Sequence, residues 1–288
     1  MTAELAPLRP GRVLAQYGPM RLVITADGPA GPDSGLAEAA GRYAFGLLPR
    51  LVPARELFRR PRHRFEPDFD EPLLNKMVAA VNLTGPADLG PMAAVAGTVA
   101  ESVTEYLKEA GAVRALVDNG GDLAVYLAPG QTVTVGIRLG LKEKTPSRQI
   151  RLDGDRRPFW GVCSSGLGGR SLTRGVADTA LCVAASAAVA DAAATALGNA
   201  CDLVSPKIKR VPAETLQPAT DIPGLLVTES VASLTENEMD QALDRAQLFA
   251  RGLEDKGIIL GALTALGGRL RLTPHFETQV APLLKANE

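Results

Sequence analysis

The amino-acid sequence predicts an α+β fold. Segments that alternate between apolar and polar residues, as half-buried strands do, are mixed with helical segments. They do not follow the strict strand–helix–strand order of a doubly wound sheet. The chain has 288 residues, of which 46% are hydrophobic, and this is enough for a sizeable core. No linker, internal repeat or low-complexity stretch divides it, so we expect a single unit over residues 1–288.

The N-terminal part of the chain predicts a hairpin followed by helices. The expected elements are strands at 12–17 and 20–26 and helices at 33–51, 72–82 and 93–110. The hairpin is indicated by Gly18 and Pro19, which separate two apolar runs. Asp33 or Ser34 suits the N-cap of the first helix because its side-chain oxygen can accept from a free backbone N–H. A loop rich in Gly and Pro at 83–92 leads into the third helix, whose first half carries small residues.

The rest of the chain alternates short strands with two helices. The expected elements are strands at 114–118, 122–126, 132–138, 159–163, 176–185 and 222–231, a helix within 183–199, a helix at 236–253, and a closing hairpin at 258–266 and 269–273. Residues 142–155 are polar and are predicted to be an exposed connection. The last helix has two alternative capping boxes, one from Ser233 to Glu236 and one from Thr235 to Glu238.

Composition and charge exclude several classes of protein. The formal net charge is −1 and aromatic residues make up only 4%, which argues against a nucleic-acid-binding protein. Residues 55–64 are locally basic and are interpreted as a solvated loop or helix end. No apolar run is long enough to span a bilayer, and the N-terminus lacks a signal core, so we expect a soluble cytoplasmic protein with no membrane partner.

The cysteines and histidines are too few and too scattered for a zinc site or a Ser-His-Asp triad. The histidines are His63 and His275, and the cysteines are Cys163, Cys182 and Cys201. Three isolated cysteines do not form a disulfide framework and fit a reducing compartment.

The alanine-rich stretch 183–199 predicts a buried helix with a row of polar residues. Asp191, Thr195 and Asn199 are spaced four apart, so they project from one face. A buried carboxylate needs compensation by a hydrogen bond, a cation or a metal, so this row is a candidate ion or phosphate site. The structural alternative is that Asp191 caps a neighbouring segment and Thr195 bonds back to its own helix.

Two glycine-containing loops are further candidates for ligand binding. Asn119, Gly120, Gly121 and Asp122 form a turn that can present backbone N–H groups to an anion, although such turns are also common in plain hairpins. The second loop, residues 164–171, offers the set Ser164, Ser165 and Gly166 followed by Gly168 and Gly169.

Cys163 immediately before the second loop could act as a nucleophile, or it could be a buried structural thiol. A reactive cysteine needs a base or a helix N-terminus to lower its pKa, and no histidine lies nearby in the sequence. No phosphate-binding Gly-x-x-x-x-Gly-Lys-Ser/Thr motif occurs either. The catalytic residues therefore stay unassigned.

Four features occur in an order that resembles the ApbE superfamily, the FAD:protein FMN transferases. They are the small-residue helix after Gly90, the Asn-Gly-Gly-Asp turn, the Ser-Ser-Gly loop, and the motif Ala-Asp-Ala-Ala-Ala-Thr-Ala-Leu at 190–197. The similarity spans residues 87–199. It implies an ApbE-like fold with two interlocked α+β halves around mixed or antiparallel sheets.

The resemblance also implies a chemistry. Members of this superfamily use a divalent cation, normally Mg²⁺, to hold the diphosphate of FAD while FMN is transferred to a Ser or Thr hydroxyl of an acceptor protein and AMP leaves. Carried over residue by residue, the metal ligands would be Asp191, Thr195 and the backbone carbonyl of Ala93. Oxygen ligands of this kind suit Mg²⁺, which usually keeps water and phosphate in its coordination shell.

The chain departs from the transferases in two places and is most similar to the compact, uncharacterised ApbE-like branch. It has no lysine at 93–97, and residues 170–175 replace a His-x-x-x-Pro-x-x-Gly segment. Three functions stay open: a Mg²⁺-dependent enzyme acting on a flavin or another nucleotide diphosphate, a non-catalytic binder of flavin, nucleotide or another phosphorylated metabolite, or an enzyme with Cys163 or Ser164 as nucleophile. A homodimer is compatible with such a protein.

Overall fold

The computed structural model describes residues 2–58, 65–86, 88–140 and 143–286. Its largest element is a ten-stranded sheet in which all paired strands are antiparallel. From one edge to the other the strands are β1 (Ala3–Arg9), β2 (Arg12–Tyr17), β3 (Met20–Gly28), β5 (Arg114–Asp118), β6 (Leu123–Leu127), β9 (Phe159–Ser165), β10 (Thr179–Ala184), β13 (Gly261–Leu266) and β14 (Arg269–Leu272), and β4 (Gly31–Pro32) pairs with β3. The α+β prediction is therefore confirmed.

Two smaller sheets complete the described strands. A three-stranded sheet contains β15 (Leu284–Lys285), β8 (Arg148–Asp153) and β7 (Thr132–Ile137) in that order, and a hairpin pairs β11 (Ile208–Pro212) with β12 (Leu226–Val231). The prediction of an exposed polar connection at 142–155 was wrong, because β8 lies within it. Ile150 and Leu152 alternate with polar residues and are fully buried. Two apolar residues among charged ones gave too weak an alternation to be recognised.

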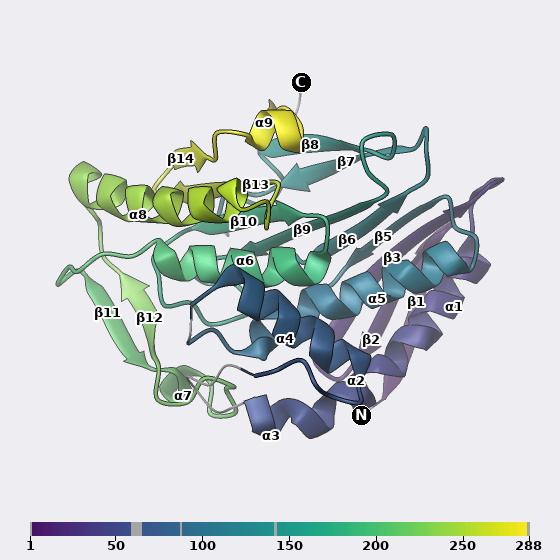
Figure 1. Cartoon of the computed structure of the whole chain (residues 1–288), viewed down its shortest axis with the longest axis horizontal. Coiled ribbons are helices and arrows are strands. Elements are labelled where there is room, and N and C mark those ends of the chain that lie inside the picture. Colours follow the sequence, from purple (N-terminus) through teal and green to yellow (C-terminus); the bar gives the residue numbers. More distant parts are fainter. Residues whose placement is uncertain (1, 59–64, 87, 141–142, 287–288) are drawn as a thin grey trace.

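The larger helices cover one face of the ten-stranded sheet (Figure 1). In chain order the helices are α1 (Ser34–Phe45), α2 (Leu47–Leu51), η1 (Val52–Ala54), α3 (Arg55–Phe58), α4 (Pro72–Thr84), η2 (Pro91–Ala94), α5 (Val95–Glu109), α6 (Ala187–Ala200), α7 (Ala213–Leu216), α8 (Glu236–Asp255) and α9 (Phe276–Gln279). The basic stretch 55–64 begins as α3, and residues 59–64 lie outside the described part of the chain.

Several helix boundaries in the structure differ from the predicted ones. The helix expected at 33–51 is interrupted at Gly46, and its N-cap is Asp33, which accepts from the backbone N–H of Leu36 at 2.9 Å. Of the two capping boxes before α8, Thr235 and Glu238 form the real one. Strands β1 and β11 were not predicted at all.

Side-chain size differs between the two faces of the central strands. On β9 and β10, Trp160, Val162, Leu181 and Val183 point to a core shared with β7, β8 and α9. The alternating neighbours on the other face are small and include Gly161, Cys163, Ala180 and Cys182, and they pack against α6. A Cβ on Gly161 would lie 2.7 Å from the backbone nitrogen of Ala187, so the helix sits directly on the sheet.

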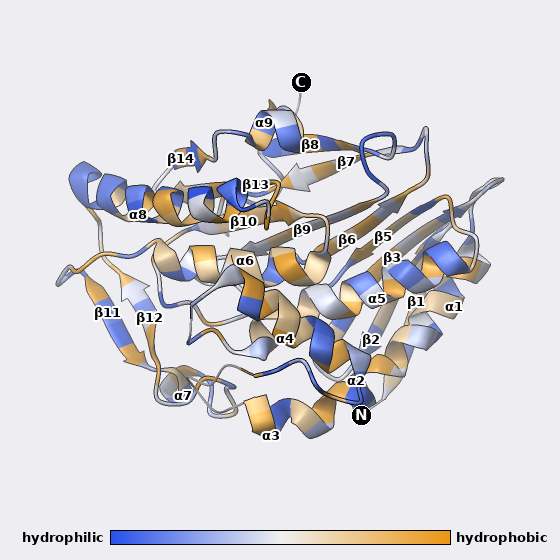
Figure 2. Cartoon of the chain, in the orientation of Figure 1, coloured by the Kyte–Doolittle hydropathy of each residue, from blue (hydrophilic) through white to orange (hydrophobic). Residues whose placement is uncertain are grey.

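Helix α6 is therefore the central buried helix of the helical layer. It packs against β9, β10, α4, α5 and α8, and it is mostly hydrophobic, whereas α8 carries hydrophilic residues over its exposed side (Figure 2). Ser186 begins α6 and accepts from the backbone N–H of Val189. Alanine has the highest helix propensity and a small side chain, which allows this close packing on all sides.

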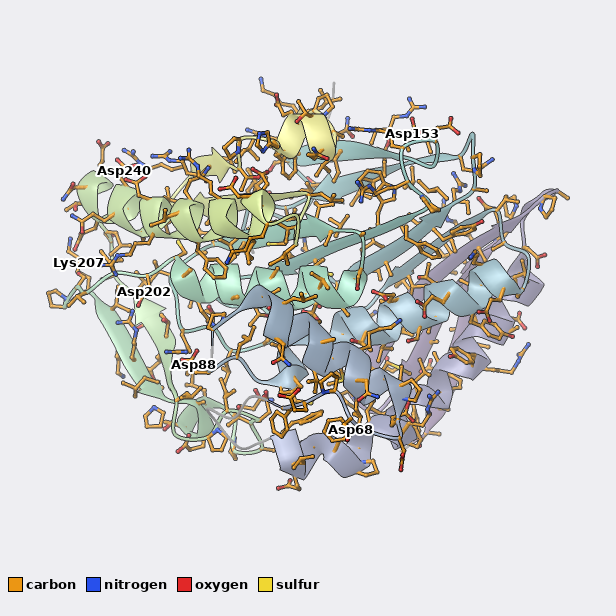
Figure 3. The ribbon with its side chains drawn as sticks, viewed as in Figure 1. Asp68, Asp88, Asp153, Asp202, Lys207 and Asp240 are labelled. Carbon is orange, nitrogen blue, oxygen red and sulfur yellow. The ribbon has the colours of Figure 1, made fainter. Side chains whose placement is uncertain are left out.

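Ion pairs connect α8 to β14 and to the β11–β12 hairpin, and two residues that form them, Asp240 and Lys207, are labelled in Figure 3. Asp240 on α8 accepts from Arg269 and Arg271 of β14 at 2.9 and 3.0 Å. Lys207 lies 2.7 Å from Glu238, which links the β11–β12 hairpin to the start of α8. No described helix has the length and apolar character needed to cross a membrane.

Candidate functional site

The site is centred on a close contact between α5 and α6. Oδ2 of Asp191, near the start of α6, accepts from the backbone N–H of Gly97 at 2.8 Å. Asp191 is 8% exposed. Gly97 is the third residue of α5, so its N–H group is one of those that a helix leaves unsatisfied, and a carboxylate there also interacts favourably with the helix dipole. Asp191 therefore does cap a neighbouring segment, the start of α5, as the structural alternative predicted.

The other members of the predicted polar row behave differently from each other. Asn199 accepts from the backbone N–H of Arg174 at 2.9 Å and fixes the loop before β10. Thr195 is half-buried, and within the described residues its hydroxyl makes no hydrogen bond, either to its own helix or to another segment. Its oxygen is therefore available to a ligand from the same face as Asp191.

The turn at residues 118–122 is held against the start of α5. The Asn119 side chain donates to the carbonyl of Ala96 at 3.2 Å. The backbone N–H groups of Asn119 and Gly121 are bonded within the turn, to the carbonyl of Asp122 and the carboxylate of Asp118. The turn therefore lies at the predicted place, but two of the N–H groups predicted to bind an anion already have partners.

The Ser-Ser-Gly loop lies between this turn and α6. Ser164 donates to the carbonyl of Gly121 at 3.4 Å, and it is exposed. Ser165 faces the other way, and its Oγ lies 3.4 Å from the position of a Cβ on Gly198 of α6. Successive residues of a strand point to opposite faces, so the two serines contact the two other parts of the site. A Cβ on Gly166 would approach the carbonyl of Asp178 at 2.5 Å, which explains the glycine.

Two carboxylates in this site carry raised pKa values. Burial is the main cause of the pKa of Asp122 rising to about 7, and the neighbouring Asp118 carboxylate adds to this effect. Burial also raises the pKa of Asp191 well above its usual range, with a further contribution from the charge of Asp122. Oδ1 of Asp122 is buried and has no hydrogen-bond partner in the described part of the chain. Neither carboxylate forms an ion pair with a described residue. Burial therefore favours the protonated form of both groups, and a bound cation would favour the ionised form.

Cys163 lies near these carboxylates, and its environment does not activate the thiol as a nucleophile. Its thiol is fully buried and donates to the carbonyl of Ala187 at 3.4 Å. Burial, followed by the charges of Asp122 and Asp191, raises the pKa of the Cys163 thiol well above its usual value. A nucleophilic cysteine requires the opposite shift. The geometry therefore favours the structural interpretation of Cys163.

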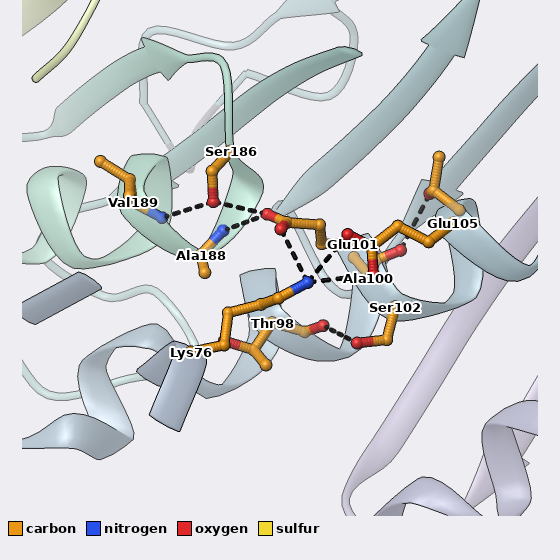
Figure 4. A network of polar contacts seen from close by, with 10 residues as sticks. Lys76, Thr98, Ala100, Glu101, Ser102, Glu105, Ser186, Ala188 and Val189 are labelled. Atoms are coloured by element: carbon orange, nitrogen blue, oxygen red, sulfur yellow. Dashed lines mark hydrogen bonds and ion pairs between the residues drawn. The ribbon is translucent and has the colours of Figure 1, made fainter. Parts of the chain in front are cut away.

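A polar network at the N-terminus of α6 was not predicted from the sequence (Figure 4). Glu101 of α5 accepts from the Ser186 hydroxyl at 2.6 Å and from the backbone N–H of Ala188 at 3.1 Å. Lys76 of α4 lies 2.9 Å from both Glu101 and Glu105. In the sequence, the signal for this network was Glu101, a single glutamate among the small and apolar residues in the first half of α5. A pocket of about 220 Å³ is lined in part by Lys76, Ser102 and Glu105, and none of the predicted site residues lines it.

Comparison with known proteins agrees with this architecture. The sequence profile of a family described as AbpE bacteria matches residues 4–272. The chain is 38% identical over 181 residues to a UPF0280 protein of Methanosarcina acetivorans, covering 62% of this chain and 68% of that protein. A UPF0280 protein of Methanocella arvoryzae is 40% identical over 157 residues, covering 54% and 61%.

Solved structures show the same fold at low sequence identity. The apo flavinyl transferase ApbE of Pseudomonas stutzeri superposes with a TM-score of 0.53 at 13% identity, covering 97% of both chains. The ApbE protein of Thermotoga maritima gives a TM-score of 0.53 at 11% identity, covering 96% of this chain and 99% of that one. The predicted resemblance is confirmed. Since the profile spans most of the chain and the fold is that of the ApbE proteins, this chain belongs to the ApbE-like family that the profile describes.

Proposed function

We propose that the protein binds a flavin or another nucleotide diphosphate together with Mg²⁺, and transfers or hydrolyses it between α6, the start of α5 and the 118–122 turn. The observation that carries this proposal is the pair of carboxylates Asp122 and Asp191. Asp191 is buried, and Oδ1 of Asp122 is buried without a hydrogen-bond partner among the described residues. The charge of Asp122 raises the pKa of Asp191, and neither carboxylate forms an ion pair with a described residue. Carboxyl groups in such a place either hold a proton or need a cation beside them, and clustered, perturbed carboxyl groups of this kind support a cation-binding site.

The donor atoms of the site fit Mg²⁺. Asp191 supplies a carboxylate, and Thr195 supplies a hydroxyl that bonds to no described residue. Ala93 supplies a backbone carbonyl on η2, which packs against α6. No group of three or more His, Cys, Asp or Glu side chains with metal-binding geometry occurs among the described residues. The protein would therefore provide few charged ligands, and water and phosphate oxygens would complete the shell, as is usual for Mg²⁺. Bound there, Mg²⁺ would neutralise charge on the diphosphate and on the leaving phosphate.

The remaining residues would position the ligand and accept a proton. Asn119 fixes the turn to the start of α5. Ser164 presents a hydroxyl at the exposed side of the site. With its pKa near 7, Asp122 is suited to accept the proton of an attacking hydroxyl or water. The name flavinyl transferase, given to the Pseudomonas stutzeri protein of this fold, favours FMN transfer to a protein hydroxyl over hydrolysis.

A second candidate function is ligand binding without catalysis. The described histidine, His275, precedes α9, where its Nδ1 lies 3.2 Å from Glu254, outside the site's residues. His63 lies outside the described residues. With Cys163 buried and its pKa raised, the described site offers Asp122 as its proton acceptor and no activated nucleophile of its own. A protein that only binds its ligand would need neither a proton acceptor nor a nucleophile.

The test is a thermal-shift titration with FAD, FMN, ADP and ATP, each with and without Mg²⁺. A ligand at a hundred times its Kd adds about 2.7 kcal/mol of stability. We expect a Mg²⁺-dependent shift that Asp191→Asn removes and that Asp240→Asn, a matched change on α8, leaves intact. A shift without Mg²⁺ that survives Asp191→Asn would support the non-catalytic binder. No shift with any of the four ligands would overturn both.

A further inference from the structure

Arg170, in the loop after β9, lies flat against the turn at residues 118–122. A Cβ on Gly120 would overlap Nη1 of Arg170 and would lie 3.0 Å from its Cζ and 3.1 Å from its Cδ. Gly120 has φ of +74°, so glycine is favoured at this position for its backbone conformation as well as for the space it leaves. The other end of the guanidinium donates through Nη2 to the carbonyl of Pro19 at 2.9 Å, on the β2–β3 hairpin. Arg170 is thus held between two turns of the large sheet.

Arg170 forms no ion pair with any residue of the described part of the chain. Within the described residues no carboxylate lies within ion-pairing distance of it, and its hydrogen bond is to a neutral carbonyl. Arg174, four residues later, differs in this respect because it pairs with Asp88. The Arg170 side chain is exposed, so the remaining N–H groups of its planar fork are available.

Arg170 also lies within electrostatic reach of the site. Its positive charge lowers the pKa of Asp122, against the larger effect of burial. The carboxyl groups of Asp118, Asp122 and Asp191 lie in this region, and in their ionised forms they would repel a phosphate, so a nearby cation favours an anionic ligand. Ser164 of β9, whose hydroxyl donates to the carbonyl of Gly121, contacts the same turn.

We propose that Arg170 binds the phosphate oxygens of the ligand and so determines that the site selects diphosphates over uncharged nucleosides. This inference rests on the proposed function. A guanidinium fork matches two phosphate oxygens, and such charge-assisted bonds are among the stronger ones in proteins. Because neutral backbone groups hold Arg170 in place, phosphate binding requires no existing ion pair to be broken. Arg170 is a binding residue here and takes no part in proton transfer.

The test compares the whole protein with Arg170→Gln, Arg170→Lys and Arg42→Ala by calorimetric titration of ADP with Mg²⁺. Gln keeps a donor for the Pro19 carbonyl, Lys keeps the charge without the fork, and Arg42 is an exposed arginine on α1 that pairs with Glu38. We expect Arg170→Gln to weaken ADP binding roughly 10- to 100-fold. Arg170→Lys should recover part of the loss, and Arg42→Ala should bind as the wild type does.

Mn²⁺ binding without nucleotide, followed by electron paramagnetic resonance, separates a phosphate contact from a general disturbance of the site. Unchanged Mn²⁺ affinity in Arg170→Gln, alongside weaker ADP binding, supports the inference. Equal loss of Mn²⁺ and ADP binding would overturn it, and so would wild-type ADP affinity in Arg170→Gln, which would leave the proposed function standing. Failure of the wild type to bind ADP, FAD or inorganic pyrophosphate under any condition would overturn both.

Discussion

The backbone N–H of Gly97 donates to Oδ2 of Asp191 at 2.8 Å, although the two residues are 94 positions apart in the chain. A Cβ on Gly97 would lie 2.7 Å from the Cβ of Asp191 and would collide with the carbonyl of Ala187. Helices α5 and α6 can therefore approach closely enough for this hydrogen bond only because residue 97 has no side chain. The same approach brings Asp191 to the turn that carries Asp122.

Gly97→Ala should separate the two helices. Overpacking a close contact typically lowers stability by about 1–3 kcal/mol, and here the obstacle is backbone. The free energy of unfolding in urea measures the loss. Gly252→Ala is the matched control, because it is also a helical glycine but has nothing within 4 Å of its Cβ position. That variant should gain about 0.5–1 kcal/mol from helix propensity. Equal effects of the two substitutions would contradict the proposed close contact.

Lys76→Met should destabilise the N-terminal end of α6. It leaves Glu101 and Glu105 without their shared cation, and the Glu101 side chain is only 14% exposed. We expect a loss of about 2 kcal/mol, typical of removing a charged hydrogen-bond partner from a largely buried group. Lys209→Met, which breaks an ion pair whose lysine is 67% exposed, should cost under about 1 kcal/mol. Chemical denaturation of both variants gives the comparison, and similar losses would show that the network does not support α6.

The raised pKa of Asp122 predicts a pH dependence of stability in metal-free protein. Its pKa is about 7 in the folded protein and near 3.8 in the unfolded chain. Between these values the folded state holds a proton on Asp122 that the unfolded chain has released, so Asp122 makes stability fall as pH rises from about 4 to 7. Asp191, whose pKa is also raised, adds a slope of the same sign. Asp122→Asn should therefore reduce the dependence of unfolding free energy on pH in this window, measured in the presence of a chelator. An unchanged slope would mean that Asp122 ionises normally.

Cys163 should be unreactive in the native protein. Its thiol is buried and its pKa is raised, so little thiolate forms at pH 8. Iodoacetamide followed by mass spectrometry should modify Cys163 only after the protein is unfolded, with the urea-denatured sample as the positive control. Cys163→Ala should retain any nucleotide binding or turnover. Rapid native alkylation, or loss of turnover in the variant, would restore Cys163 as a candidate nucleophile.

The sequence was most informative where a local pattern has one physical meaning. Alternation and glycine turns predicted most strands of the large sheet, and the capping pattern at Thr235 and Glu238 located the start of α8. The strand at 148–153 was missed because its partners β7 and β15 lie elsewhere in the chain, and only that pairing turns two scattered apolar residues into a buried face. The break of the first helix at Gly46 was missed because apolar residues continue beyond it, although glycine is itself a poor helix former.

For the site, the sequence by itself determined the local segments that compose it. They are a small-residue helix, a glycine turn, a serine loop, and an alanine helix bearing Asp191 and Thr195. What only the tertiary structure decided is which of them meet and in what chemical state. The depth at which Asp122 and Asp191 are buried raises their pKa values, and this depth depends on contacts between α5, α6 and β9. Arg170 and Glu101 acquire their positions through partners far away in the chain. Charge interactions and desolvation depend on distance in space, which a linear sequence does not record.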